Sequence, residues 1–356
     1  MHSPAEHKLL PSLRGLCAAS VLSLVASLAA CGDTADATTD TSDTAAADAV
    51  DTNDTSDTLS PDSASPDTAA PDTTDTAPDT TEPADTRTET DVVLDAPLGG
   101  ARPATVVVPE SYQPGTPTPL VILLHGYSAT GAIQDLYLDF SPRAAASGFI
   151  AIVPEGTTNP SGLQFWNASP GWCCDFLRSG VDDQGYLLSL IDEASRRFTI
   201  DPKRVYLVGH SNGGFMAHTM ACNHADRIAA IVSIAGSLPL DAADCAPSEP
   251  VSVLQVHGTF DAVIAYNGVL GQFPSAETVV SRWASHDGCE ALPQSDPTMD
   301  YDGAVFGAET HPLPYPGCTH SAVALWRMDG SAHIPGFTPA FIPAALDWLL
   351  AHPKAP

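Results

Sequence analysis

Basic side chains are scarce in this sequence. Its 356 residues include 14 Lys and Arg against 43 Asp and Glu, which gives a formal net charge of −29. A nucleic-acid partner is excluded, because binding the phosphates requires clustered Lys and Arg. An anionic membrane surface would repel the chain as well, so any membrane attachment has to be covalent or apolar.

Long hydrophobic runs are missing too. The apolar stretch at residues 15–30 has 16 residues, whereas a membrane-spanning helix needs about 20. It follows Lys8 and Arg14 and ends in small residues before Cys31, which is typical of a signal peptide. The ending resembles a bacterial lipobox. We therefore expect residues 1–30 to be a lipoprotein signal peptide and Cys31 to be lipidated, the alternative being an ordinary secretory peptide.

The following segment has almost no apolar side chain larger than alanine. Residues 33–90 consist mainly of Asp, Thr, Ala, Pro and Ser, with 16 acidic residues against the single Arg87. Such a segment cannot bury enough apolar surface to offset the entropic cost of ordering. Its prolines and like charges favour an extended chain. We predict that residues 31–92 form a disordered linker, which would hold residues 93–356 away from a lipid surface.

The cysteines lack the spacing of a metal site. Neither a CxxC nor an HxxxH pattern accompanies them, so no metal is expected. Cys17 would leave with the signal peptide and Cys31 would carry the lipid. The remaining six predict three disulfides in an exported domain, although the sequence does not determine their pairing. Adjacent cysteines could bond to each other, but we expect separate partners for them. The six candidates are Cys173, Cys174, Cys222, Cys245, Cys289 and Cys318.

Residues 93–356 alternate between two patterns. Short runs rich in β-branched residues and Leu, bounded by Pro and Gly, occupy residues 105–108, 120–124, 149–153, 205–208, 231–234, 251–254 and 322–326. Most are continuously apolar, as expected for strands covered on both faces. Helical periodicity appears at residues 186–198, 215–222 and 340–351. The alternation predicts a single α/β domain with a mostly parallel sheet and helices on both faces.

One motif indicates a nucleophile. Gly209-His210-Ser211-Asn212-Gly213 fits G-x-S-x-G, directly after an expected strand and before an expected helix. This context predicts a nucleophile elbow, the strand-to-helix turn of the α/β-hydrolase fold. The two glycines are required because Ser211 has to occupy a strained turn with no room for side chains on either side. The helix N-terminus adds positive potential where an oxyanion would develop.

A catalytic serine requires a base and an orienting acid. In this fold they follow the serine in the order acid then His, each on a loop after a strand. Asp261 lies just beyond the strand expected near residues 251–256 and is our choice for the acid, with Asp244 as the alternative. His333 follows the expected strand at 322–328, on a loop between Gly330 and Gly336, and is our choice for the base.

The oxyanion hole requires two backbone N–H donors. One comes from the residue after the nucleophile, here Asn212. The other comes from the loop after an early strand, and we assign it to Tyr127.

Together these residues resemble the polyhydroxybutyrate-depolymerase/feruloyl-esterase family of exported hydrolases over most of residues 95–350. The resemblance rests on the elbow and on Leu124-His125-Gly126, Phe165-Trp166-Asn167, Trp172-Cys173-Cys174, Val181-Asp182-Asp183, Asp201-Pro202-Lys203-Arg204-Val205-Tyr206 and His257-Gly258-Thr259-Phe260-Asp261. The family's usual Gly-Gly-His-Thr-Trp-Pro-Gly signature reads Gly330-Ser331-Ala332-His333-Ile334-Pro335-Gly336 here. Because its Trp is missing, the family's acyl-group preference does not carry over.

The resemblance implies a serine esterase acting on feruloyl or acetyl esters of plant polysaccharide, with a polyhydroxyalkanoate depolymerase as the alternative. We expect no separate polymer-binding domain, which favours the first reading. Trp166, Trp172 and His210 are the candidate substrate-binding residues, although the tryptophans could equally be core residues. No cofactor is implied. We expect an exported monomer, anchored through Cys31 at the cell surface or in the periplasm. A non-catalytic binding lipoprotein is a further alternative, disfavoured by the complete Ser211, Asp261 and His333 set.

Overall fold

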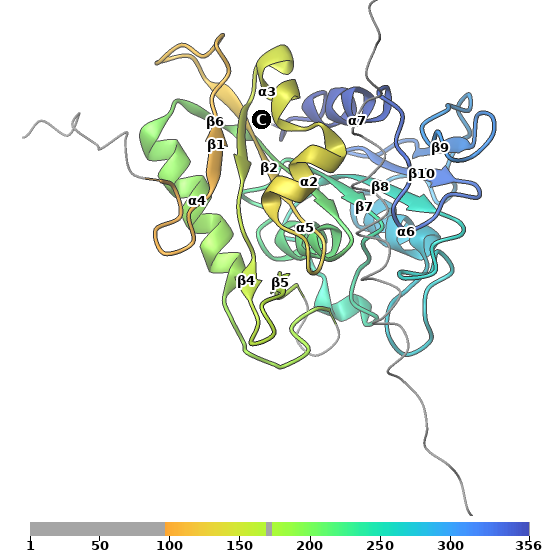
Figure 1. Ribbon diagram of the computed structural model, residues 1–356. Coiled ribbons are helices and arrows are strands. Elements are labelled where there is room, and N and C mark those ends of the chain that lie inside the picture. Colours follow the sequence, from red (N-terminus) through yellow and green to blue (C-terminus); the bar gives the residue numbers. More distant parts are fainter. Residues whose placement is uncertain (1–96, 169–172, 356) are drawn as a thin grey trace, which may run out of the picture. The chain divides into compact units, whose positions relative to one another are not determined.

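The computed structural model describes residues 97–168 and 173–355, all of which belong to one unit, Thr88–Pro356. An eight-stranded sheet runs through this unit in the order β1-β3-β2-β6-β7-β8-β10-β9 (Figure 1). The predicted signal peptide and linker, with Cys31, lie outside the described residues, as does Trp172. Their boundaries at residues 30 and 92 stay predictions.

Six of the strands form a parallel core, and one antiparallel strand closes each edge. The antiparallel strands are β1 and β9. The strands of this sheet are β1 (Thr105–Val107), β2 (Thr118–Leu124), β3 (Ile150–Val153), β6 (Ile200–His210), β7 (Ala230–Ile234), β8 (Ser252–Gly258), β9 (Thr310–Tyr315) and β10 (Val323–Met328). The predicted mostly parallel sheet is confirmed. Most of its central strands are fully buried, which explains why their sequences are continuously apolar.

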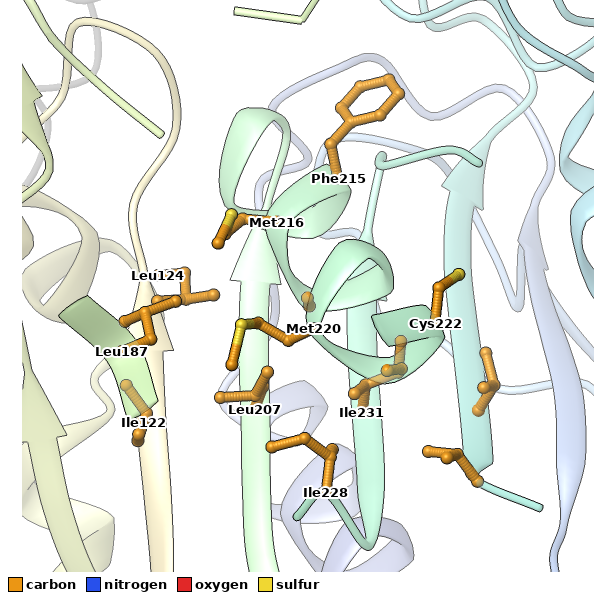
Figure 2. Close-up of a cluster of buried hydrophobic side chains, with 14 of the residues drawn as sticks. Ile122, Leu124, Leu187, Leu207, Phe215, Met216, Met220, Cys222, Ile228 and Ile231 are labelled. Atoms are coloured by element: carbon orange, nitrogen blue, oxygen red, sulfur yellow. The ribbon is translucent and has the colours of Figure 1, made fainter. Parts of the chain in front are cut away.

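Helices cover both faces of the sheet, and alternate residues of each strand belong to separate cores. On one face Ile122 and Leu124 belong to a core that also contains residues of three helices, α4 (Asp183–Arg197), α5 (Asn212–Asn223) and α6 (Ala276–His286). Figure 2 shows this core, with Met216 and Met220 of α5 lying over Leu207 and Ile231.

The opposite face has its own core. There Val121 and Leu123 belong to a core that also contains residues of α2 (Gly131–Leu138), α3 (Ser141–Ser147) and α7 (Phe341–Leu350). The period of two along β2 therefore separates the two cores, as the geometry of a strand requires.

Apart from α6, which has 11 residues, the helices and strands that the sequence analysis did not assign are short or contain prolines. β9 carries Pro312 and Pro314, and it forms because proline is tolerated at the edge of a sheet, where one side of the strand needs no hydrogen bonds. α2 and α3 have eight and seven residues. A two-stranded hairpin, β4 (Thr157–Thr158) with β5 (Gln164–Phe165), follows β3. Too few residues repeat in these segments to reveal a period.

All six candidate cysteines form disulfides, as predicted. The pairs are Cys222–Cys245, Cys289–Cys318 and Cys173–Cys174. Our expectation of separate partners for Cys173 and Cys174 is wrong, because these neighbours are bonded to each other. Three disulfides indicate a protein of an oxidising compartment. Among the described residues, no helix combines the length and apolarity needed to cross a bilayer.

The two disulfides that close longer loops should contribute to stability. Cys289–Cys318 spans 29 residues, for which the loss of chain entropy in the unfolded state predicts about 3.6 kcal/mol. Replacing both cysteines of this pair by Ser should lower the free energy of unfolding in urea by that amount. Cys222→Ser with Cys245→Ser, which opens a loop of 23 residues, should give a similar loss. Dithiothreitol should lower the melting temperature of the wild type. An unchanged melting temperature would show that these bonds do not stabilise the fold.

Candidate active site

Ser211 lies in a sharp turn between β6 and α5. Its backbone adopts φ 54° and ψ −121°, a conformation that costs a non-glycine residue about 1–3 kcal/mol. Hydrogen bonds fix both sides of the turn: the Ser211 N–H donates to Ile234 O (2.8 Å), and the Phe215 N–H donates to Ser211 O (3.0 Å). The strained turn that the motif predicted is therefore present.

The flanking glycines have no room for a side chain. A Cβ on Gly209 would lie 2.1 Å from Gly213 O, and one on Gly213 would lie 2.2 Å from Leu124 O. Both contacts are with backbone atoms, which cannot move aside. Glycine at these positions lets α5 begin directly against the carboxyl end of β2.

The structure brings Ser211, Asp261 and His333 together from three separate loops. His333 Nε2 is 2.9 Å from Ser211 Oγ, and His333 Nδ1 is 2.7 Å from Asp261 Oδ2. Both contacts have the length of a hydrogen bond and share one imidazole ring. Asp244, the alternative acid, lies in a short 3-10 helix at Ala242–Asp244 and is exposed.

Asp261 is held in its charged form. Its Oδ1 accepts hydrogen bonds from the N–H groups of Val263 and Ile264, each 2.8 Å long. Burial by itself would raise the pKa of Asp261, but hydrogen bonds from His257 and His333 outweigh it and hold that pKa well below its usual range. The carboxylate is therefore ionised wherever the protein is folded near neutral pH.

Two further histidines at the site are buried and neutral. His125 donates from Nδ1 to Gly126 O (2.8 Å), and its Nε2 accepts from the Gly156 N–H (2.8 Å). Burial lowers the pKa of His125 to about 4. His210 donates from Nε2 to His333 O (2.9 Å), and burial, together with the nearby His333, lowers the pKa of His210 to about 4.

Two of the predicted substrate-binding residues are in the interior. Trp166 is fully buried and donates from Nε1 to His125 O (3.1 Å), which favours the alternative of a core residue over that of an aromatic wall. His210 is 6% exposed and donates to the carbonyl oxygen of His333, and its substrate-binding role stays a prediction. The sequence shows that Trp166 is apolar and aromatic, but those properties suit a core and a binding wall equally.

The two predicted oxyanion donors lie on the two segments that flank Ser211. The Asn212 N–H is in the first turn of α5, where N–H groups have no partner within the helix. Tyr127 follows Gly126, and a Cβ on Gly126 would be 3.5 Å from the Ser211 Cβ. The loop after β2 therefore runs beside the serine. The oxyanion role of both residues stays a prediction.

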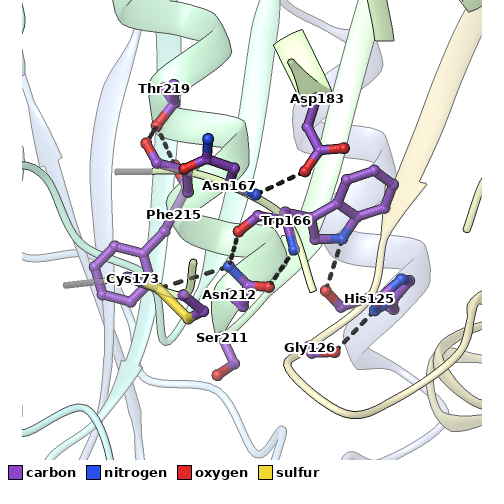
Figure 3. Close-up of a disulfide and its surroundings, with 12 residues drawn as sticks. His125, Gly126, Trp166, Asn167, Cys173, Asp183, Ser211, Asn212, Phe215 and Thr219 are labelled. Atoms are coloured by element: carbon purple, nitrogen blue, oxygen red, sulfur yellow. Dashed lines mark hydrogen bonds between the residues drawn. A yellow bond between two sulfur atoms is a disulfide. The ribbon is translucent and has the colours of Figure 1, made fainter. Parts of the chain in front are cut away.

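The Asn212 side chain is engaged in the interior. Figure 3 shows its amide paired with the backbone of Trp166: Oδ1 accepts from Trp166 N (2.7 Å) and Nδ2 donates to Trp166 O (2.9 Å). Nδ2 also lies 3.6 Å from Cys173 Sγ. The same segment is anchored by Asp183, whose Oδ2 accepts from the Asn167 N–H (2.7 Å). Our sequence reasoning missed this anchoring role, although Val181-Asp182-Asp183 was part of the resemblance.

Apolar side chains near the site were also missed. Phe176 and Leu177 are 59% and 63% exposed, and the Phe176 ring lies edge-on to Tyr127 with centroids 5.3 Å apart. Asp175 separates them from the bonded Cys173 and Cys174. A short Asp-Phe-Leu sequence carries no signal of its own, so only the position beside Tyr127 identifies these residues as candidate substrate contacts. The described residues include no group of His, Cys, Asp and Glu suited to a metal.

Comparison with known proteins supports an esterase domain. Residues 105–271 match the phospholipase/carboxylesterase family. The chain is 30% identical over 206 residues to feruloyl esterase B of Piromyces equi, covering 55% of this chain and 37% of that protein. It is 25% identical over 249 residues to feruloyl esterase D of Neurospora crassa, covering 67% and 75%.

A depolymerase and a solved esterase structure complete the comparison. The chain is 30% identical over 143 residues to poly(3-hydroxyalkanoate) depolymerase C of Paucimonas lemoignei, covering 38% of this chain and 33% of that protein. The acetyl xylan esterase structure from Aspergillus awamori has a TM-score of 0.50 at 14% identity, over 69% of this chain and 93% of that one. That likeness confirms the fold. The sequence relatives fit the resemblance drawn from the motifs, although this chain spans less than half of the Piromyces and Paucimonas proteins.

The buried histidines make the fold sensitive to mild acid. In the unfolded chain their pKa is about 6.5, whereas burial lowers the folded pKa of His125, His210 and His218 to about 4. Between pH 6.5 and 4 the unfolded chain binds more protons, so stability is complete above pH 6.5 and is lost as the pH falls. Each histidine contributes a slope of up to about 1.4 kcal/mol per pH unit.

Urea unfolding at pH 5, 6, 7 and 8 measures this slope. We expect the free energy of unfolding to be nearly constant from pH 7 to 8 and to drop by roughly 5 kcal/mol from pH 7 to 5, because three histidines each contribute up to about 1.4 kcal/mol per pH unit below pH 6.5. Equal values at pH 7 and pH 5 would contradict the neutral, buried state of these rings.

Proposed function

We propose that the protein is an exported serine esterase that cleaves carboxylic esters through an acyl-enzyme, with support from its similarity to the phospholipase/carboxylesterase family and to feruloyl esterase B. The observation that carries the proposal is the position of His333. One imidazole ring lies within hydrogen-bond distance of both Ser211 Oγ and Asp261 Oδ2, immediately beside a strained strand-to-helix turn.

The geometry supports the following chemistry. His333 Nε2 takes the proton of Ser211 Oγ as the oxygen attacks the ester carbonyl carbon, and the Asp261 carboxylate stabilises the imidazolium that forms. The N–H groups of Asn212 and Tyr127 stabilise the oxyanion. The alcohol leaves with the proton from His333, and the acyl group stays on Ser211. His333 then activates water, which releases the acid and regenerates the serine.

We propose feruloyl or acetyl esters of plant polysaccharide as the substrates. Support comes from the relatives named feruloyl esterases and from the exposed Phe176 beside Tyr127, which offers an apolar contact for an aromatic acyl group. A polyhydroxyalkanoate depolymerase is the second candidate, favoured by the similarity to the Paucimonas depolymerase. Both candidates use the same triad, so they differ only in the ester bound.

An ester panel with a matched variant tests the function. The wild type should hydrolyse p-nitrophenyl acetate, and Ser211→Ala should reduce kcat by about 10⁶ because the nucleophile is removed. Release of ferulate from methyl ferulate or acetate from acetylated xylan would identify the first substrate class, whereas clearing of polyhydroxybutyrate particles alone would identify the second. A Ser211→Ala variant as fast as the wild type would contradict the mechanism. If the folded wild type hydrolysed none of these esters, a binding role would explain the protein better than an esterase function.

We further propose that Cys31 carries a lipid that anchors the exported protein at the cell surface or in the periplasm. The proposal rests on the sequence around Cys31 and agrees with three disulfides in the domain. Cys31→Ala should move the protein from the membrane fraction to the soluble fraction in its native host. Cys222→Ser is the control, because it removes a cysteine without touching the anchor. Unchanged membrane fractionation of Cys31→Ala would exclude lipidation at this site.

A further inference from the structure

A buried chain of hydrogen bonds runs from α6 to the acid of the proposed triad. Trp283 Nε1 lies 3.2 Å from His218 Nδ1, and His218 Nε2 lies 2.9 Å from Gln255 Oε1. Gln255 Nε2 lies 3.1 Å from His257 Nδ1. His257 Nε2 in turn lies 3.4 Å from Asp261 Oδ2. None of these five side chains is more than 5% exposed, so water does not replace the missing partner when one link is broken.

The donor and acceptor chemistry of these side chains fixes the direction of each hydrogen bond between them. The indole N–H of Trp283 can only donate, so His218 Nδ1 accepts and His218 carries its proton on Nε2. That proton is donated to Gln255 Oε1. The Gln255 amide cannot be flipped, because its Nε2 also donates to the carbonyl oxygen of Gly236 (2.9 Å), which can only accept.

The fixed amide determines the state of His257. Gln255 Nε2 points its hydrogen at His257 Nδ1, so that nitrogen has to accept and cannot carry a proton. The single ring proton is therefore on Nε2. It faces Ile264 O at 2.8 Å and Asp261 Oδ2 at 3.4 Å. An imidazolium at this position would place an N–H against the NH₂ group of Gln255, which has no lone pair to accept it.

This arrangement matters because of the oxygen that His257 faces. Asp261 Oδ1 is occupied by the two backbone N–H groups of Val263 and Ile264, whereas Oδ2 faces both His333 and His257. A positive charge on His257, 3.4 Å from Oδ2, would offset the negative charge of the Asp261 carboxylate, because the buried site screens charges poorly. A neutral ring donates its N–H to Ile264 O (2.8 Å) and lies 3.4 Å from Asp261 Oδ2, while the Ile264 N–H binds Asp261 Oδ1. The ring thereby positions the carboxylate and leaves its charge available to His333.

We propose that His257 is a positioning residue of the esterase site: the buried chain locks it as a neutral imidazole with the proton on Nε2, which orients Asp261 toward His333 without neutralising it. The inference rests on the proposed function for its catalytic consequence. The state of the ring is a separate, directly measurable property. The other titratable group packed on this ring is Tyr266, whose ring lies edge-on with centroids 5.7 Å apart.

Histidine ¹⁵N NMR of the full-length wild type tests the state of the ring without any assay of activity. At pH 7 His257 should show a protonated Nε2 and an unprotonated Nδ1. The exposed His320 is the internal reference for a ring in contact with water. A proton on Nδ1 of His257, alone or together with one on Nε2, would overturn the inference.

Two substitutions test the role of the ring. In His257→Gln the side-chain amide reaches the position of Nε2 and can still donate toward Asp261 Oδ2. In His257→Asn the shorter amide reaches only the position of Nδ1, so it keeps the Gln255 contact and loses the donor to Asp261. We expect His257→Asn to lower kcat on p-nitrophenyl acetate roughly 10- to 100-fold, as for loss of a hydrogen bond to a charged group, with KM within about twofold. His257→Gln should recover most of that loss.

Equal losses in the two variants, or a His257→Asn variant as active as the wild type, would overturn the positioning role. Melting temperatures establish that both variants are folded; if one is not, the wild-type NMR result decides. A folded wild type that hydrolyses no ester refutes the proposed function and leaves the tautomer measurement standing. An active wild type with the wrong tautomer refutes the inference alone.

Discussion

The site depends on one steric constraint, the close approach of the turn at Ser211 to the end of β2. Gly213 leaves no space between α5 and Leu124 O, where even a Cβ would lie at 2.2 Å. The same approach brings Gly126, and with it the loop that carries Tyr127, alongside the serine. Position of the nucleophile and position of the predicted second oxyanion donor are thus consequences of a single contact. Packing of α5 on the sheet offsets the strain of about 1–3 kcal/mol at Ser211.

The acid and the base are placed by a second pair of neighbouring strands. β8 and β10 are parallel and in register up to Gly258 and Met328, so the loops that follow them start at the same edge. These loops are joined, because the Thr259 N–H donates to Met328 O (2.9 Å) and the Phe260 N–H donates to Ser331 O (3.0 Å). The distance between Asp261 and His333 is therefore set by the sheet, and the histidine needs no mobile segment to reach the acid.

The contrast between the local turn at Ser211 and the distant loops that carry Asp261 and His333 explains how much of the site the sequence could predict. The elbow is local, so G-x-S-x-G between a strand and a helix was sufficient to place Ser211. Asp261 and His333 are distant in sequence, and they were found only because strand ends in this fold follow a fixed order. No comparable rule exists for Trp166, whose buried position depends on the Asn212 amide and the His125 carbonyl. The bond between Cys173 and Cys174 is likewise a matter of which sulfurs meet in space.

Ser211 does not make the capping hydrogen bond that is usual at the start of a helix, and this bears on both the nucleophile and the oxyanion site. A serine at the N-cap of a helix commonly uses its Oγ to cap the N–H groups of the first turn. Ser211 occupies the N-cap of α5 without such a bond, and its Oγ lies 2.9 Å from His333 instead. The Asn212 side chain cannot take over the cap, because it is bound to Trp166. The helix N-terminus is thereby left with N–H groups and positive potential beside the serine oxygen, the environment that an oxyanion requires.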